Sequence, residues 1–137
     1  MIVDTSALVA IFADERERAA FLLAIASSGR CMTSAGSWVE FATVLVRKLG
    51  VADPAAVQRS FSASLRLMIV PTDATQAALA SEGYARFGRG APHGASLNFG
   101  DCFAYALAKA TGEPLLFKGD DFNHTDLTLA TESSYPH

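Results

Sequence analysis

The sequence predicts an α/β fold in which three layers, helix, sheet and helix, are built around a central parallel sheet of four or five strands. Short apolar runs that suit buried strands alternate along the chain with longer segments of helical periodicity. The runs are apolar throughout, which is typical of parallel strands covered by helices on both faces. With 137 residues, the chain is expected to form one domain, residues 1–137, with its own core.

Composition and charge narrow the function classes. Half of the residues are hydrophobic and 18% are charged, which excludes a disordered chain. The formal charge of −3 gives no general electrostatic reason to bind nucleic acid, so any such activity would depend on local arrangement. No apolar run approaches the ~20 residues of a membrane helix, and Asp4 interrupts the N-terminus too early for a signal peptide. We therefore expect a cytoplasmic protein, no membrane partner, and reduced core thiols at Cys31 and Cys102.

The first two strands are expected at residues 1–3 and 31–33. Thr5 or Ser6 can cap the helix that follows the first strand. Asp14 and Glu17 have the spacing of a capping box, which predicts that a second helix begins there and continues to Gly29.

Two further helices follow the second strand. Ser34 or Ser37 is expected to open the first of them, and Gly50 to end it. Asp53 followed by proline predicts the start of another helix, which reaches about residue 65. The apolar face of the first of these helices comprises Trp38, Phe41, Leu45 and Leu49.

The second half of the chain repeats the pattern. A strand is expected at 67–70, a helix from Asp73, a loop at 88–96, a helix from Asp101 to about Thr111, and a strand at 115–118. An edge strand at 127–131 and a frayed tail complete the chain. The helix after Asp73 is expected to bury Ala77, Ala80, Tyr84 and Phe87.

Acidic residues gather where strands end or helices begin: Asp4, Asp101, Asp120 and Asp121. In open α/β sheets, ligands bind at the carboxyl ends of the strands. Carboxylates that share a cleft repel one another, and a hard divalent ion such as Mg²⁺ or Mn²⁺ would relieve the repulsion. An aspartate at a helix start also serves as an ordinary cap. Glu40 lies opposite the apolar face of its helix, so the helical wheel leaves open whether it faces solvent or the cleft.

Four segments, MIVDTSALVAIF, SWVEFATVL, LNFGDCFAYALA and LLFKGDDF, occur in this order along nearly the whole chain. Together they resemble the PIN-domain ribonucleases, specifically the VapC-type toxins of type II toxin–antitoxin systems. The resemblance implies a Mg²⁺ site, able to accept Mn²⁺, made from Asp4, Glu40, Asp101 and an acid of the GDDF segment. It also implies an endoribonuclease acting on structured RNA, a cognate VapB-type antitoxin, a homodimer and a toxin–antitoxin hetero-oligomer.

The fourth acid remains open between Asp120 and Asp121. Many relatives carry a Thr-x-Asp pattern after this strand, whereas residues 117–119 here read Phe-Lys-Gly. Phe122 is expected to return to the core and to orient the residue before it, which favours Asp121 as the metal-site acid and gives Asp120 a turn-stabilising role. A catalytically degenerate PIN-like domain that only binds RNA or a partner is the alternative function.

Basic residues near the 88–96 loop, Arg86, Arg89 and Lys118, could contact RNA phosphates, although scattered surface charges explain them equally well. An antitoxin tail is expected to place an arginine against the acids. The rest of that tail would bind an apolar groove between the helices of residues 14–27 and 38–49.

Overall fold

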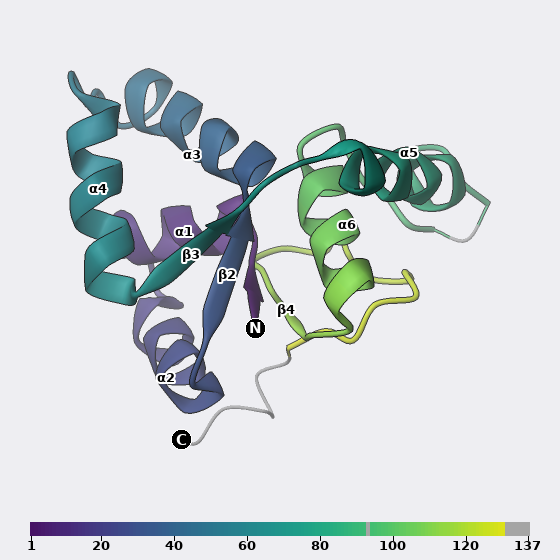
Figure 1. Ribbon diagram of the computed structural model, residues 1–137, viewed down its shortest axis with the longest axis horizontal. Coiled ribbons are helices and arrows are strands. Elements are labelled where there is room, and N and C mark those ends of the chain that lie inside the picture. The colour runs from purple at the N-terminus through teal and green to yellow at the C-terminus, as the bar shows by residue number, and fades with distance from the viewer. Residues whose placement is uncertain (93, 131–137) are drawn as a thin grey trace.

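The computed structural model describes residues 1–92 and 94–130, and a parallel sheet lies at its centre (Figure 1). Its four strands are arranged in the order β3-β2-β1-β4. The pairs β1–β2, β1–β4 and β2–β3 are all parallel. The strands are β1 (Ile2–Val3), β2 (Cys31–Ser34), β3 (Leu67–Val70) and β4 (Leu115–Leu116).

The expected edge strand at 127–131 is reduced to one parallel bridge between Leu129 and Leu115. Thr131 and the tail lie outside the described residues. The last strand of the sheet is also shorter than the expected 115–118, because β4 ends at Leu116. The prediction of a central parallel sheet is confirmed, with four strands in the described part of the chain.

Six helices in the described residues form the two outer layers (Figure 1). Successive residues of a strand point to opposite faces, so Ile2 packs with α5 and α6, whereas Val3 packs with α1, α2 and α3. Leu115 and Leu116 divide in the same way. The three-layer prediction is therefore confirmed. The helices are α1 (Thr5–Phe12), α2 (Arg18–Ser28), α3 (Ala35–Arg47), α4 (Pro54–Leu65), α5 (Ala74–Phe87) and α6 (Asp101–Thr111).

Two helix starts differ from the prediction. Asp4, rather than Thr5 or Ser6, caps α1 by accepting the Ser6 N–H at 3.0 Å. The predicted capping box is wrong, because Asp14 adopts a left-handed conformation with φ of 56° and α2 begins only at Arg18. Glu17 makes no capping hydrogen bond, since its carboxylate instead lies 3.2 Å from the Lys118 ammonium.

Other helix boundaries follow the sequence signals closely. Ser34 caps α3 by accepting the N–H of Gly36, and Asp53 caps α4 by accepting the N–H of Ala56 at 3.1 Å. The apolar face predicted for α3 is partly wrong, because the helix ends at Arg47 and Leu49 lies beyond it, 39% exposed.

The buried face of α5 also differs from the prediction. Ala80 and Phe87 are buried as expected, but Ala77 and Tyr84 are exposed. The contact with α6 instead runs through Gly83, where an added methyl group would overlap the ring of Tyr105. The close approach of α5 to α6 therefore rotates the buried face toward this glycine.

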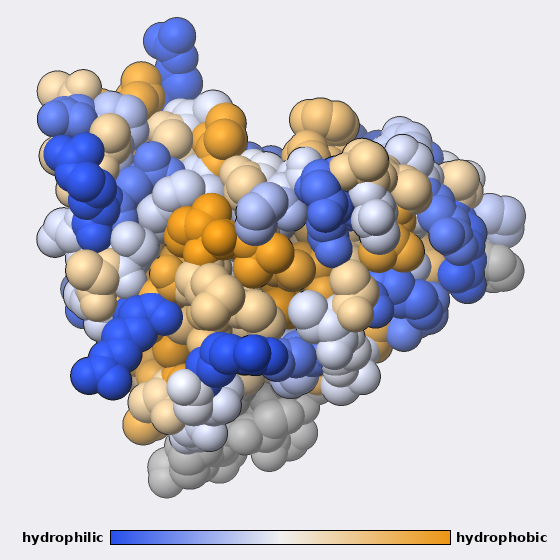
Figure 2. Space-filling view, in the orientation of Figure 1, coloured by the Kyte–Doolittle hydropathy of each residue, from blue (hydrophilic) through white to orange (hydrophobic). Residues whose placement is uncertain are grey.

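The edge strand β3 exposes apolar surface. Met68 is 52% exposed, and Figure 2 shows apolar side chains gathered near the middle of the visible face, over β3. Cys31 and Cys102 are free and buried, as predicted. Within residues 1–92 and 94–130, no helix is both long enough and apolar enough to cross a membrane.

Candidate active site

A cleft of about 340 Å³ opens at the carboxyl end of β1, between α1, α3, α6 and the loop after β4. Asp4, Glu40, Asp101 and Asp121 all line it, so residues separated by more than 100 positions meet there. Asp120 faces away: it is exposed, its carbonyl accepts the Asn123 N–H at 3.0 Å, and its carboxylate accepts from the Asn123 amide at 3.2 Å.

Asp4 is held in place by hydrogen bonds to the neighbouring strand β4 and to the first turn of α1. Its backbone N–H donates to Leu116 of β4 at 3.0 Å. Its Oδ2 accepts from the Ser6 N–H at 3.0 Å and from the Ser6 hydroxyl at 2.7 Å. Its Oδ1 is buried and has no hydrogen-bond partner. Burial raises the pKa of Asp4 to about 6; the Ser6 hydrogen bonds oppose this shift and the Glu40 charge adds to it.

Asp101 begins α6 and forms a reciprocal pair with Asn98. Its Oδ2 accepts the Asn98 N–H, and its own N–H donates to Asn98 Oδ1, both at 2.9 Å. Burial raises the pKa of Asp101 to about 8; the Asn98 hydrogen bond opposes the shift, while the charges of Asp4 and Asp121 add to it. The carboxylates therefore form one electrostatically coupled group.

Glu40 reaches the cleft because Gly100 has no side chain. The Glu40 carboxylate lies directly against the Gly100 backbone, and a methyl group added there would overlap it. The contact joins the first half of α3 to the start of α6, as does the packing of the Phe103 ring against Gly36. The structure thus answers the question that the helical wheel left open: Glu40 is half-buried and faces the cleft.

Two lysines and one further hydroxyl complete the surroundings of the acids. Ser96 donates to Asp121 Oδ1 at 3.4 Å, which connects the 88–96 loop to the site. Lys48 and Lys118 line the cleft. Of the other basic residues singled out in the sequence, Arg86 lies 3.3 Å from Asp126.

The donor atoms of the cleft suit a hard divalent cation. They are almost entirely oxygens, and the unpartnered buried Oδ1 of Asp4 is the kind of group that a cation satisfies. In the described residues, no three His, Cys, Asp or Glu side chains already lie together as a metal-binding group. Binding of an ion would therefore require the carboxylates to move closer together around it.

Ser6 and Asn98 are site residues that the sequence reasoning did not identify. The sequence pattern indicates only a helix cap at Ser6, yet its hydroxyl accepts the Lys118 N–H at 2.9 Å and donates to Asp4, which ties the end of β4 to Asp4. Asn98 could have been found, because Asn-x-x-Asp has the spacing of a capping box.

Comparison with known proteins identifies the family to which this chain is similar. The PIN domain family model matches residues 1–127. Ribonuclease VapC42 of Mycobacterium tuberculosis (strain H37Rv) is 42% identical over 133 residues, covering 95% of this chain and 98% of that protein. Ribonuclease VapC28 of the same strain is 43% identical over 135 residues, covering 96% and 98%.

A solved structure shows the same fold. The crystal structure of Mycobacterium tuberculosis VapC20, a Sarcin-Ricin loop cleaving toxin, has a TM-score of 0.72 and 20% sequence identity, and the match covers 94% of this chain and 97% of that one. The match to the PIN domain family model includes all the acids of the cleft, from Asp4 to Asp121. The chain therefore belongs to the PIN-domain family, and its relatives within that family are the VapC ribonucleases.

Proposed function

We propose that the protein is an endoribonuclease toxin that hydrolyses RNA phosphodiester bonds with the help of Mg²⁺, for which Mn²⁺ can substitute. The observation that carries the proposal is the buried, unpartnered oxygen of Asp4 in a cleft that four other carboxylates share. Relatives named ribonucleases, which match more than nine-tenths of the chain, support RNA as the substrate. The proposed location of the enzyme is the cytoplasm, where it would meet an RNA substrate.

Asp4, Glu40, Asp101 and Asp121 would hold the ion. When bound, such an ion lowers the pKa of a coordinated water and neutralises charge that develops on a phosphodiester. The contribution of the protein is orientation: Ser6 fixes the carboxylate of Asp4 through two hydrogen bonds, and the backbone before α6 fixes that of Asp101.

Cleavage of a labelled RNA stem–loop by the purified protein, with and without chelator, tests the proposal. We expect cleavage only with Mg²⁺ or Mn²⁺, and none for Asp101→Asn. Asp53→Asn is the matched control, because Asp53 also lies at the start of a helix but outside the cleft. Full cleavage in excess chelator would refute the metal requirement, and RNA binding without any cleavage would favour the degenerate alternative.

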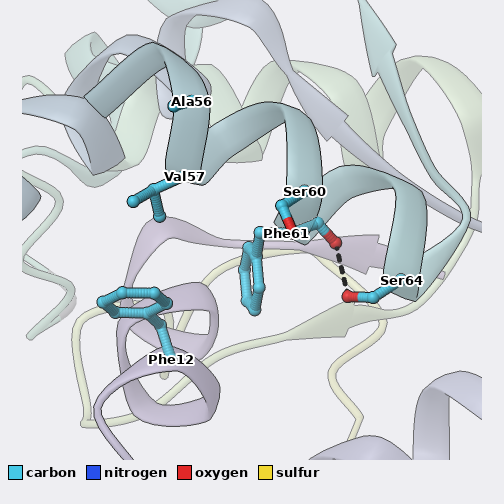
Figure 3. A pocket seen from close by; sticks show the side chains of 6 residues that line it. All are labelled: Phe12, Ala56, Val57, Ser60, Phe61 and Ser64. Atoms are coloured by element: carbon cyan, nitrogen blue, oxygen red, sulfur yellow. Dashed lines mark hydrogen bonds between the residues drawn. The ribbon is translucent and has the colours of Figure 1, made fainter. Parts of the chain in front are cut away.

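A VapB-type antitoxin is proposed as the partner that inhibits the enzyme. The apolar pocket that supports this idea lies between α1 and α4 (Figure 3). The groove expected between the helices of residues 14–27 and 38–49 stays a separate prediction. Phe12 closes the pocket at one end of α1, and Asp4 lies at the other end. Eight residues of helix span about 12 Å, so about four extended residues of a tail could join the pocket to the acids.

An arginine in that tail would bind the carboxylates as a bidentate fork. We expect alanine substitution of the C-terminal arginines of the co-expressed antitoxin to restore RNA cleavage. Antitoxin that inhibits equally well after these substitutions would contradict this arrangement.

A homodimer is proposed as the assembly of the toxin, within a larger toxin–antitoxin hetero-oligomer. Large apolar side chains next to the cleft support it: Phe99 is 79% exposed and Val39 is 65% exposed. Both line a pocket that Glu40 also borders, so burial of this face would place a second subunit beside the acids. We expect Phe99→Asp to convert a dimer into a monomer in light scattering, and an unchanged mass would exclude this face.

A further inference from the structure

Lys118 is the first basic residue after β4, and its main chain is tied to the acidic site. Its N–H donates to the Ser6 hydroxyl at 2.9 Å, and that hydroxyl donates to Asp4 Oδ2 at 2.7 Å. One hydroxyl group therefore separates the backbone of Lys118 from a carboxylate of the cleft. The side chain lines the same cleft, so the position of this lysine is set by the site.

The Lys118 ammonium is held by two glutamates from the turn between α1 and α2. It lies 3.4 Å from Glu15 and 3.2 Å from Glu17, which also explains why this turn departs from the predicted capping box. The three side chains are partly exposed, at 39% for Lys118, 36% for Glu15 and 19% for Glu17. The Glu15 pair is exposed enough to contribute little free energy, whereas the Glu17 oxygen that faces the ammonium is buried, so Glu17 is the stronger competitor for this lysine.

We propose that Lys118 is a substrate-positioning residue: its ammonium leaves Glu15 and Glu17 to bind a phosphate of RNA in the cleft. The two glutamates then compete with RNA for the same cation and weaken binding of the substrate. The inference rests on the proposed ribonuclease function and adds to it one residue that binds the substrate and two that oppose it.

The charge balance of the cleft is the reason to expect this. Five carboxylates line it, Glu15 among them, so a polyanionic RNA approaches an electronegative surface and gains from any cation at the rim. A lysine carries its charge on a flexible four-carbon stem, which suits exchange between a carboxylate and a phosphate. Two carboxylates on one ammonium leave the group with a net negative charge, so their competition with a phosphate is substantial.

The test measures binding of a fluorescein-labelled RNA stem–loop with a randomised loop, by anisotropy in chelator, and cleavage of the same RNA with Mg²⁺. We expect Lys118→Met to weaken binding and raise KM about tenfold with a smaller change in kcat, and to reduce the salt slope by about 0.7–1. Lys118→Arg should retain most of the affinity, because it keeps the cation.

The distinguishing result concerns the glutamates. The double variant Glu15→Gln/Glu17→Gln should bind the RNA about threefold to tenfold more tightly, and most of this gain should vanish in a Lys118→Met background. Asp14→Asn is the matched control from the same turn: its carboxylate is 85% exposed and lies near Arg18, so its removal should change binding little.

Two outcomes would overturn the inference. One is that Lys118→Met weakens RNA binding no more than Lys109→Met does. The Lys109 ammonium of the unaltered protein pairs with Asp126 outside the cleft, so it serves as the control. The other is an equal gain from the glutamate substitutions with and without Lys118, which would be a general charge effect. If Lys118→Met fails to fold, the glutamate double variant is compared with Asp14→Asn, and a gain in binding no larger than that of this control refutes the competition. Absence of cleavage by the unaltered protein would instead refute the proposed function.

Discussion

Replacing Asp4 by asparagine should stabilise the metal-free protein above about pH 6 while abolishing its activity. Burial raises the pKa of Asp4 from 3.8 to about 6. A shift of this size corresponds to about 3 kcal/mol of destabilisation when the carboxylate is ionised. The amide of asparagine can still accept both Ser6 hydrogen bonds, but its NH₂ group takes the place of the unpartnered Oδ1. An unsatisfied buried donor costs about 1–3 kcal/mol, so the net stabilisation is at most about 2 kcal/mol.

The sign of the pH dependence follows from the raised pKa. Between pH 3.8 and about 6 the folded state keeps a proton on Asp4 that the unfolded state has lost, so stability falls as the pH rises through this window. Asp4→Asn removes this contribution. The two proteins should therefore differ most above about pH 6, and the advantage of the variant should shrink or reverse near pH 4.

Urea unfolding in chelator, followed by circular dichroism over this pH range, measures the effect, and thermal unfolding should show an increase of about 3–5 °C per kcal/mol. Millimolar Mg²⁺ should stabilise the unaltered protein by preferential binding to the folded state and the variant much less. A variant that is destabilised by the same amount at every pH would refute the reasoning, because the charge of Asp4 would then not be the cause of the destabilisation above pH 6.

Three further predictions concern the other acids and the metal. Gly100→Ala should lower kcat at least about tenfold by displacing the Glu40 carboxylate. In a Glu40→Ala background the same substitution should lower kcat little further, which a double-mutant cycle measures. Asp121→Asn should cost far more activity than Asp120→Asn at saturating Mg²⁺, and the reverse ranking would move the assignment to Asp120. Chelator should abolish cleavage and Mn²⁺ should restore it, which a fluorescence cleavage assay can follow.

Local signals were sufficient for most of the fold. Asp53 followed by proline marks the first residue of α4 correctly, and the apolar run at 67–70 matches β3 in full. These signals depend on neighbours in the sequence: a cap satisfies free N–H groups within its own first turn, and proline at the first position lacks the N–H that would need a partner. Asp4 and Asp101 could be identified on the same basis, because each lies where a helix begins.

Features that depend on contacts between distant residues could not be predicted in this way. The Asp14–Glu17 capping box was predicted from spacing alone, but Glu17 pairs with Lys118, which is about a hundred residues further along the chain. The orientation of Glu40 depends on Gly100, which belongs to another helix start. In both cases the local pattern was compatible with two outcomes, and a tertiary contact selected one of them.

Asp4 caps α1 and Asp101 is the first residue of α6, so both carboxylates lie at helix N-termini, where the peptide dipoles favour negative charge. That effect contributes about 0.3–1 kcal/mol per helix at exposed positions, which is less than one pKa unit. Burial nevertheless raises the pKa of Asp4 to about 6 and that of Asp101 to about 8, so desolvation and mutual repulsion exceed the stabilisation that the helices provide. Five carboxylates line the cleft against two lysines, Lys48 and Lys118, and Lys118 is paired with Glu15 and Glu17. The site therefore remains short of positive charge unless a divalent ion supplies it.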